Sequence, residues 1–325
     1  MFVAPDIIQV RIPLPFSLKF VNCYLVRGPG GWALIDTGIH WPPAIAAWHE
    51  TLDELDLPFS AIREIYVTHH HVDHVGLAGW WQQASGAAVF MTAGEALMVQ
   101  RIWRDRRARR LEIEFFVRHG MPQPYAAALV EQTASAYEMT QPLPDVTMLH
   151  SLRGDPEALA PLEIVGRTFQ PLICAGHADD QLLLYEPATR TLFCADHVLP
   201  RISPNISIFP DTRPDPLGRF LSSFPALAGL DVATALPGHG AIFHNLSGRM
   251  AELHAHHLVR LDEMLAAIGA RATGYEVATR VFPLDALSSH QVQFALGETL
   301  AHLDYLVVQG RAELVEEEAP SYRPR

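Results

Sequence analysis

Four side chains of the types that bind metal ions stand close together in residues 68 to 76. His69, His71, Asp73 and His74 lie within the stretch Thr-His-His-His-Val-Asp-His-Val-Gly. Neutral imidazole and carboxylate groups are nitrogen and oxygen ligands that zinc and related divalent ions accept in proteins. The stretch is therefore a candidate metal-binding loop.

The loop directly follows Glu64 to Val67, a β-branched and aromatic run typical of a buried strand. In an extended backbone alternate side chains point to the same side, so His69 and His71 can share one ion. Asp73 and His74 can then turn toward a second ion. A histidine-rich surface loop or a tag remnant is the alternative, but tags lie at chain termini and this run follows a strand. We therefore expect a site for two metal ions.

Three further ligand candidates, His177, Asp196 and His239, follow predicted strands later in the chain. A single histidine after a strand is more often structural than a ligand. Two ions that share a water need about seven side chains, however, and the histidine loop supplies only part of that set. Asp36 ends another predicted strand, where it can orient a ligand as a hydrogen-bond acceptor. A simple turn at Asp36-Thr37-Gly38 explains the same residues equally well.

The elements that must position these residues alternate between strands and helices. Three β-rich runs, at residues 7–12, 20–27 and 32–35, predict a meander. A helix is expected over residues 42–56, before the strand that leads into the histidine loop, and another helix and strand follow up to residue 91. This alternation predicts an α/β (α+β) layered fold.

Residues 95 to about 140 carry the pattern of two long helices, broken near Gly120, with no strand signal between them. We interpret this stretch as a helical lid inserted in the fold. It holds the most basic segment of an acidic chain. Arg104 and Arg107 are candidates to bind an anionic part of the substrate, because guanidinium forks suit phosphate and carboxylate. A solvated surface with ion pairs to nearby glutamates is the competing interpretation.

These motifs resemble those of metallo-β-lactamase-fold hydrolases. The matching motifs occur in that family's order, over about residues 7 to 245: Asp36-Thr37-Gly38, His69-x-His71-x-Asp73-His74, His177, Asp196 and His239. The resemblance implies a four-layer αββα sandwich with the site at one edge of the sheets.

The resemblance also implies a ligand set. One metal would be bound by His69, His71 and His177, a second by Asp73, His74 and His239, and Asp196 would bridge both. His70 and His197 lie within the motifs but match no ligand position. One departure from the family's pattern is Ala178-Asp179-Asp180 directly after His177.

The C-terminal part of the chain is mostly helical. Helix signals and a final strand signal occur at residues 246–268, 275–281, 288–308 and 311–316. This order resembles the small winged-helix-like domain of a branch of these hydrolases that includes RNA-cleaving enzymes. The segment holds seven arginines against eleven acidic residues, a net charge of −4, which opposes contact with phosphate backbones.

We therefore expect a catalytic domain at residues 1–245 and a C-terminal domain at residues 246–325. The second domain is expected to wall the active-site cleft or to form a dimer contact. Its leucines at positions 253, 258, 261 and 265 are expected to be buried against the catalytic domain.

The composition limits the class of protein and its location. The chain has 325 residues, of which 49% are hydrophobic and 18% are charged. No apolar run approaches the ~20 residues needed to cross a bilayer. The first sixteen residues contain Asp6, Arg11 and three prolines, so we expect no export signal, no membrane partner and a cytoplasmic protein. The three cysteines lie in apolar contexts and are expected to be core thiols.

The expected mechanism uses a hydroxide held between two metal ions, because bound ions lower the pKa of water from about 15.7 to about 7. Asp73 and Asp196 are the catalytic candidates, since either can take up a proton as the transition state collapses. Two zinc ions are the expected cofactors. Manganese or iron are the alternatives for a ligand set made only of nitrogen and oxygen.

The expected substrate is a small anionic ester, thioester or lactone. A single-strand endoribonuclease is the alternative, suggested by the C-terminal resemblance. Nucleic acid is disfavoured as a partner by the net charge of −12, and only Trp103 among the lid arginines hints at a track for bases. A non-catalytic or redox member of the fold is a third alternative, disfavoured because every ligand position is present.

Overall fold

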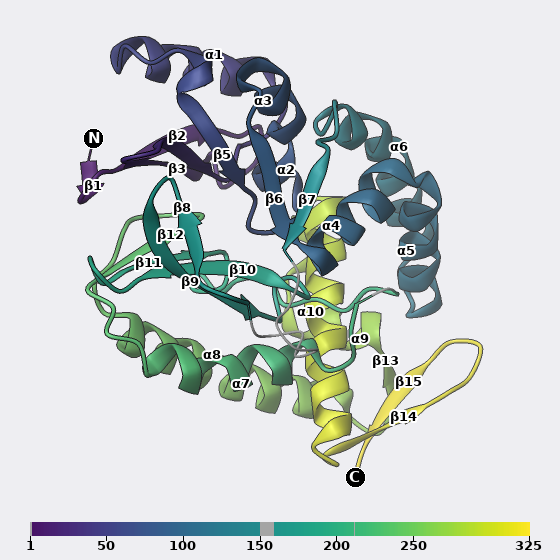
Figure 1. Ribbon diagram of the computed structural model, residues 1–325. Coiled ribbons are helices and arrows are strands. Elements are labelled where there is room, and N and C mark those ends of the chain that lie inside the picture. Colours follow the sequence, from purple (N-terminus) through teal and green to yellow (C-terminus); the bar gives the residue numbers. More distant parts are fainter. Residues whose placement is uncertain (1, 150–158, 211) are drawn as a thin grey trace.

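Two large sheets lie face to face and are covered on their outer sides by helices (Figure 1). The computed structural model describes residues 2–149, 159–210 and 212–325. The first sheet has seven strands in chain order, and it changes from antiparallel to parallel pairing at the fourth strand. Its strands are β1 (Phe2–Ala4), β2 (Ile7–Pro13), β3 (Phe20–Gly28), β4 (Gly31–Ile35), β5 (Ile62–Tyr66), β6 (Ala88–Thr92) and β7 (Val146–Leu149).

The second sheet has five strands in the order β12-β11-β10-β9-β8, and the pair at one edge, β11 with β12, is parallel. Leu182 and Leu184 of the central strand contribute to the core between the sheets, whereas Leu183 faces the outer helices, as the alternation of a strand requires. The strands are β8 (Leu162–Ile164), β9 (Arg167–Cys174), β10 (Gln181–Glu186), β11 (Thr191–Ala195) and β12 (Thr234–Pro237).

Helices complete the four layers. α1 (Pro42–Glu54) and α3 (Ala78–Ser85) bury Trp48 and Trp81 against the first sheet, with the two rings edge to face at 4.9 Å. α7 (Pro216–Ala228) and α8 (Leu246–Ile268) cover the second sheet (Figure 1). The predicted αββα sandwich is therefore confirmed.

An inserted helical segment joins β6 to β7, in agreement with the predicted lid. Its predicted break at Gly120 is confirmed, since this glycine has a φ of 99° directly after a helix. The first predicted helix was too long, however. A π-helical turn ends it, and Asp105 starts a new helix by accepting a hydrogen bond from the backbone N–H of Arg107. The elements are α4 (Ala93–Val99), η2 (Gln100–Arg104), α5 (Arg106–Arg118) and α6 (Gln123–Glu138).

The C-terminal helices begin at or close to the predicted residues, because side chains cap them. Thr273 with Glu276, and Ser288 with Gln291, form capping boxes at the starts of α9 (Gly274–Val281) and α10 (Ser289–Val308). A three-stranded antiparallel sheet follows in the order β13-β15-β14. Its strands are β13 (Ala272–Thr273), β15 (Ser321–Pro324) and β14 (Ala312–Val315), of which the sequence predicted β14 alone.

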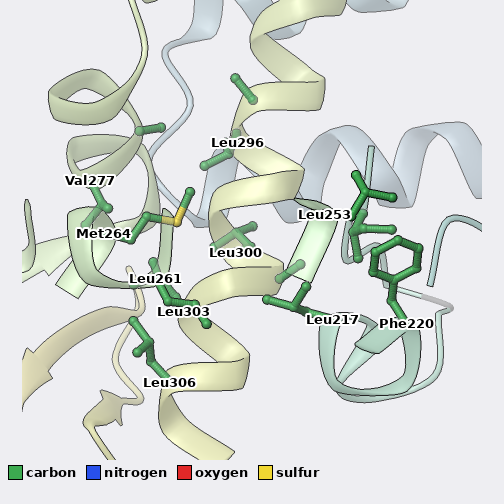
Figure 2. Packing of buried hydrophobic residues seen from close by; sticks show 14 of the residues in the cluster. Leu217, Phe220, Leu253, Leu261, Met264, Val277, Leu296, Leu300, Leu303 and Leu306 are labelled. Atoms are coloured by element: carbon green, nitrogen blue, oxygen red, sulfur yellow. The ribbon is translucent and has the colours of Figure 1, made fainter. Parts of the chain in front are cut away.

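α10 is the centre of the largest hydrophobic cluster. Figure 2 shows Leu296, Leu300, Leu303 and Leu306 of this helix among side chains of α7, α8 and α9. Residues of the lid and of the second sheet belong to the same cluster. The C-terminal segment therefore shares one core with the sandwich. The expectation for Leu258 was wrong: this side chain is 47% exposed, because it lies outside the buried face of α8.

Two smaller expectations concern cysteines and membranes. Cys23, Cys174 and Cys194 are free and buried, so the prediction of core thiols is confirmed. Within the three described ranges of the chain, no helix has the length and apolar character needed to span a bilayer.

Candidate metal centre

The ligand candidates lie where strands of both sheets end. Asp36 follows β4, and the histidine loop follows β5, the parallel neighbour of β4. His177, Asp196 and His239 follow β9, β11 and β12 of the facing sheet. Carboxyl ends of parallel neighbours meet at the same sheet edge, so residues up to 203 positions apart in the chain come together.

Part of the histidine loop is helical. Asp73 and His74 lie in the short helix α2 (Val72–Val75), where the sequence analysis expected a loop. Within one helical turn, successive side chains point in directions about 100° apart. This geometry separates Asp73 and His74 from the extended pair His69 and His71.

Three histidines form the first group. The nitrogen atoms that His69, His71 and His177 offer to an ion lie within 4.8 Å of one another. Nε2 of His69 is 3.1 Å from Nδ1 of His71. Zinc–nitrogen bonds of about 2.0–2.1 Å at tetrahedral angles place two nitrogens roughly 3.3 Å apart, so this pair has the spacing of ligands that share one ion.

Asp73, His74 and His239 form the second group, with their ligand atoms also within 4.8 Å of one another. Nε2 of His239 lies 3.1 Å from Oδ2 of Asp73. Nε2 of His74 lies 4.0 Å from the same oxygen. The group offers two nitrogens and one oxygen to an ion.

Asp196 lies between the two groups. Its Oδ2 atom is 3.6 Å from Nε2 of His177 in the first group. The same atom is 3.5 Å from Nε2 of His74 and 3.3 Å from Nε2 of His239 in the second group. One carboxylate oxygen is thus near ligand atoms of both groups.

Hydrogen bonds from surrounding residues orient the imidazole rings. Nδ1 of His74 donates to Oδ2 of Asp36 at 2.8 Å. Nδ1 of His177 and Nδ1 of His239 donate to backbone carbonyls, of Asn205 at 2.9 Å and of Phe20 at 2.9 Å. In each case the bond fixes the tautomer and leaves Nε2 as the ligand atom.

The three-histidine group is electrically suited to receive a cation. Burial lowers the pKa of His69, His71 and His177, and neighbouring imidazoles lower it further for His69 and His71. These rings are therefore neutral near pH 7, the protonation state in which imidazole binds a metal.

The second group holds protons that a cation would displace. Burial opposes protonation of His74 and His239, but the surrounding carboxylates outweigh it. Asp36 contributes most to the raised pKa of His74, and Asp196 raises the pKa of His239 to about 10. Protonated imidazoles hold the pKa of Asp196 well below its usual range, although burial opposes this. Metal binding at such a site releases protons.

Unpaired buried atoms show that the residues fit metal ions. Nε2 of His177 and Nε2 of His74 are buried and have no hydrogen-bond partner among the described residues. A buried polar atom without a partner costs about 1–3 kcal/mol, and coordination of a cation removes that cost. Seven donors of nitrogen and oxygen type converge here, as a pair of divalent ions requires.

The structure also gives roles to residues that the sequence left unassigned. His197 lies outside the ligand groups and bonds Oγ of Ser223 at 2.7 Å. The unusual residues after His177 are held by arginines: Arg213 binds Asp180 at 2.6 Å, and Arg219 approaches Asp179 at 3.4 Å.

The lid arginines divide into two kinds. Arg109 and Arg110 pair with glutamates of their own helix, at 2.7 Å in each case. Arg104 and Arg107 are exposed, and their guanidinium groups have no ion pair or hydrogen bond within the described part of the chain. The ion-pair interpretation therefore accounts for Arg109 and Arg110 but not for Arg104 and Arg107.

Comparison with known families agrees with the fold. A family model described as the metallo-beta-lactamase superfamily matches residues 17–239. A second model, the metallo-beta-lactamase-like C-terminal domain, matches residues 261–323. Because the first match covers more than half of the chain, the protein belongs to the metallo-beta-lactamase superfamily and is a metallo-hydrolase of that fold.

Similar proteins extend the match over nearly the whole chain. The "Probable metallo-hydrolase YqjP" of Bacillus subtilis (strain 168) is 26% identical over 315 residues, which cover 93% of this chain and 92% of that protein. A metallo-beta-lactamase family protein from Thermus thermophilus has a crystal structure with a TM-score of 0.88, 32% identity and full coverage of both chains, 100% each. A beta-lactamase domain protein from Burkholderia ambifaria matches with a TM-score of 0.86 and 30% identity, over 100% of this chain and 94% of that chain.

Proposed function

We propose that this metallo-hydrolase is dinuclear and cleaves a small ester, thioester or lactone. The observation that carries the proposal is the position of Asp196. Its Oδ2 atom lies 3.3 to 3.6 Å from Nε2 atoms of both ligand groups, which suits a carboxylate shared by two ions. His69, His71 and His177 would hold one ion, and Asp73, His74 and His239 the other.

Two ions, when bound, would supply a water molecule that loses its proton near neutral pH and a Lewis acid for the substrate oxygen. The chain itself supplies proton transfer and orientation. Oδ1 of Asp196 has no hydrogen-bond partner in the described residues, so it can receive a proton at this atom and return it to the leaving group. Asp73 is the other acid–base candidate, since its Oδ2 lies beside His239. Burial of the surrounding histidines keeps bulk water away from these transfers.

Zinc is the proposed metal. Five imidazole nitrogens and two carboxylates are ligands that zinc prefers, and no thiol takes part among the described residues. Manganese and iron accept the same donors and remain the alternatives. Metal-free protein reconstituted with each ion separately would rank them by turnover.

The endoribonuclease alternative receives less support. The three helices and the small sheet after residue 245 have the element order of a winged-helix domain, but α10 is buried among α7, α8 and the lid. A buried helix presents no face to a nucleic acid. Trp103, the one aromatic residue suggested as a platform for bases, is half-buried and donates Nε1 to the carbonyl of His70 at 2.7 Å. We therefore propose that the C-terminal segment supports the site rather than binding RNA.

Turnover of a panel of esters, thioesters, lactones, β-lactams and single-stranded RNA tests the proposed chemistry. Elemental analysis of metal-saturated protein should give about two equivalents per chain. Replacing Asp196 with Ala should lower metal content at both groups and abolish turnover, whereas Asp231→Ala, at an exposed ion pair with Arg190, should change neither. One equivalent in saturated wild-type protein would contradict the dinuclear proposal. Cleavage of RNA alone would contradict the substrate class.

A further inference from the structure

We propose that Glu95 positions the three-histidine group and connects it to the helical lid. This inference rests on the proposed function, because it concerns residues that would hold a metal ion. Glu95 lies in the first turn of α4 and has an exposed fraction of 0%. In the described part of the chain Glu95 has no arginine or lysine partner, so it requires several hydrogen-bond donors, and the surrounding loops supply them.

One oxygen of Glu95 binds the histidine loop. Oε2 accepts the backbone N–H of His70 at 3.0 Å and the ring nitrogen Nδ1 of His70 at 2.6 Å. A carboxylate only accepts, so Nδ1 of His70 carries the proton. His70 stands between His69 and His71 in the chain, so this double contact fixes the backbone that joins two of the three ligands.

The other oxygen binds the loop that carries the third ligand. Oε1 of Glu95 accepts the backbone N–H of Asp180 at 2.9 Å, three residues after His177. Glu95 is therefore in direct contact with both loops that supply the three-histidine group. The seven ligand candidates lie at several strand ends. Among the described residues, the Glu95 side chain is hydrogen-bonded to both the histidine loop and the His177 loop.

The start of α4 is held against the same loop. Oγ1 of Thr92 accepts the N–H of Glu95 at 3.4 Å and donates to the carbonyl of Asp180 at 2.8 Å. Gly94 permits this approach, since a Cβ atom there would lie 1.8 Å from Oδ2 of Asp180. The start of α4, the Glu95 carboxylate and the His177 loop are therefore in direct contact.

The lid makes a second contact with the same residue of the histidine loop. Nε1 of Trp103, in η2, donates to the carbonyl of His70 at 2.7 Å. Both backbone groups of His70 are thus bound by lid residues, its N–H by Glu95 and its carbonyl by Trp103. The lid is therefore bonded directly to the backbone that joins His69 and His71.

Glutamine at position 95 is nearly the same shape as glutamate but cannot reproduce this arrangement. All three partners are donors, and the amide offers one oxygen and one NH2 group. Its NH2 would face either the N–H of Asp180 or the two donors of His70. Glu95→Gln therefore removes the orienting contact of at least one ligand loop while preserving volume.

The test is a cobalt(II) titration of metal-free protein, followed by visible absorption, which reports the geometry of the bound ion. Glu95→Gln should lose roughly 10- to 100-fold in affinity for one of two equivalents, the range for partners that orient metal ligands, and should change the absorption spectrum. Asp73→Ala removes a ligand of the second group, so the same titration in this variant shows which of the two equivalents belongs to that group. The equivalent weakened in Glu95→Gln should be the other one, bound by the three histidines. Glu114→Gln is the control, since Glu114 is an exposed lid glutamate paired with Arg110.

A double-mutant cycle that combines Glu95→Gln with His70→Ala measures the coupling between the two side chains. A general loss of stability does not produce such coupling. If Glu95 acts through His70, the affinity losses of the two single variants should be strongly non-additive in the double variant. Wild-type cobalt affinity and spectrum in Glu95→Gln would overturn the proposal. Should that variant not fold, Trp103→Phe, which removes only the donor to the carbonyl of His70, must show a smaller loss at the same equivalent; no loss would also overturn the proposal. None of these readouts needs a substrate, so a failed substrate panel leaves the result intact.

Discussion

Oδ2 of Asp36 lies 2.8 Å from Nδ1 of His74, and both side chains are buried. The same carboxylate accepts the backbone N–H of Thr68 at 2.8 Å and its hydroxyl at 2.9 Å. Asp36 has a φ of 58°, in the left-handed region that aspartate and asparagine adopt more readily than most residues. It therefore joins the end of β4 to both parts of the histidine loop.

Replacing Asp36 with Asn is expected to weaken metal binding at the group formed by Asp73, His74 and His239. The amide cannot accept from all three donors, so one of its contacts is lost and the ring of His74 is less well oriented. Such changes cost roughly 10- to 100-fold in metal affinity. Zinc titration of the metal-free variant measures this, with the exposed α1 position Asp53→Asn as control. Unchanged zinc affinity would mean that Asp36 only stabilises the turn at residues 36–38.

The sequence predicts the sandwich well where periodicity and caps are clear. The helix at 246–268 and the β-rich meander appear at almost the predicted residues. The strand β7 was missed because it has only four residues. α7 was missed because Pro225 lies inside it, and a proline in a helix interior opposes a helix in sequence alone.

The ligand candidates were identifiable because each is a histidine or aspartate directly after a strand. The residues that orient these ligand candidates could not be identified from the sequence. Asn205 and Phe20 act through backbone carbonyls, which any residue possesses, at sequence separations of 28 and 219. The sequence around Glu95 indicates a different role from the one in the structure. Thr92-x-x-Glu95 has the spacing of a capping box, yet the glutamate side chain bonds His70 and Asp180 instead of completing the box.

The two unpaired lid arginines, Arg104 and Arg107, give a prediction about substrate recognition. Changing both to Ala should raise KM for an anionic substrate about 10-fold or more while kcat and metal content stay unchanged, because an interaction made equally in ground and transition states is lost. The matched control is Arg110→Ala with Arg118→Ala, which removes the same charge from lid arginines already paired with glutamates. Equal kinetics in both double variants would assign Arg104 and Arg107 to the solvated surface.

Gly297 gives a prediction about the contact between α10 and the loop that supports His177. A Cβ atom at this position would lie 2.7 Å from Oγ and 3.0 Å from Cβ of Ser207. Ser207 donates to the side chain of Asn205, whose carbonyl orients His177. Gly297→Ala should therefore destabilise the protein by about 1–3 kcal/mol, the usual cost of overpacking. Urea unfolding measures this loss.

The matched control for that prediction is Gly229→Ala, since a Cβ atom there would make only ordinary contacts at 3.4 and 3.8 Å. Its expected change is within about 0.5 kcal/mol. A loss of metal affinity in Gly297→Ala, absent from the control, would further indicate that the displacement reaches His177. Equal stability of the two variants would mean that Ser207 moves aside without strain.

Glu298, on α10, gives a prediction about the pH dependence of stability. Burial raises the pKa of Glu298 to about 7, and the charge of Arg260 opposes that rise only in part. The folded protein therefore keeps this proton up to about pH 7, whereas the unfolded chain releases it above its ordinary value of 4.5. Between these values the folded state binds more protons, so this group makes the free energy of unfolding fall as pH rises. The full effect is at most about 3 kcal/mol.

Glu298→Gln removes the titration, so the variant should gain stability relative to the wild type as pH rises from about 4.5 to 7, and the difference should then level off. Its carboxamide keeps the side-chain volume, and the backbone carbonyl of Glu298 still accepts Nδ1 of His302, at 2.8 Å in the wild type. Urea unfolding at intervals between pH 4.5 and 8, with both proteins metal-free, measures the difference. Glu50→Gln, at an exposed position on α1, should follow the wild-type curve. A constant difference between Glu298→Gln and the wild type over this range would mean that Glu298 is ionised in the folded protein.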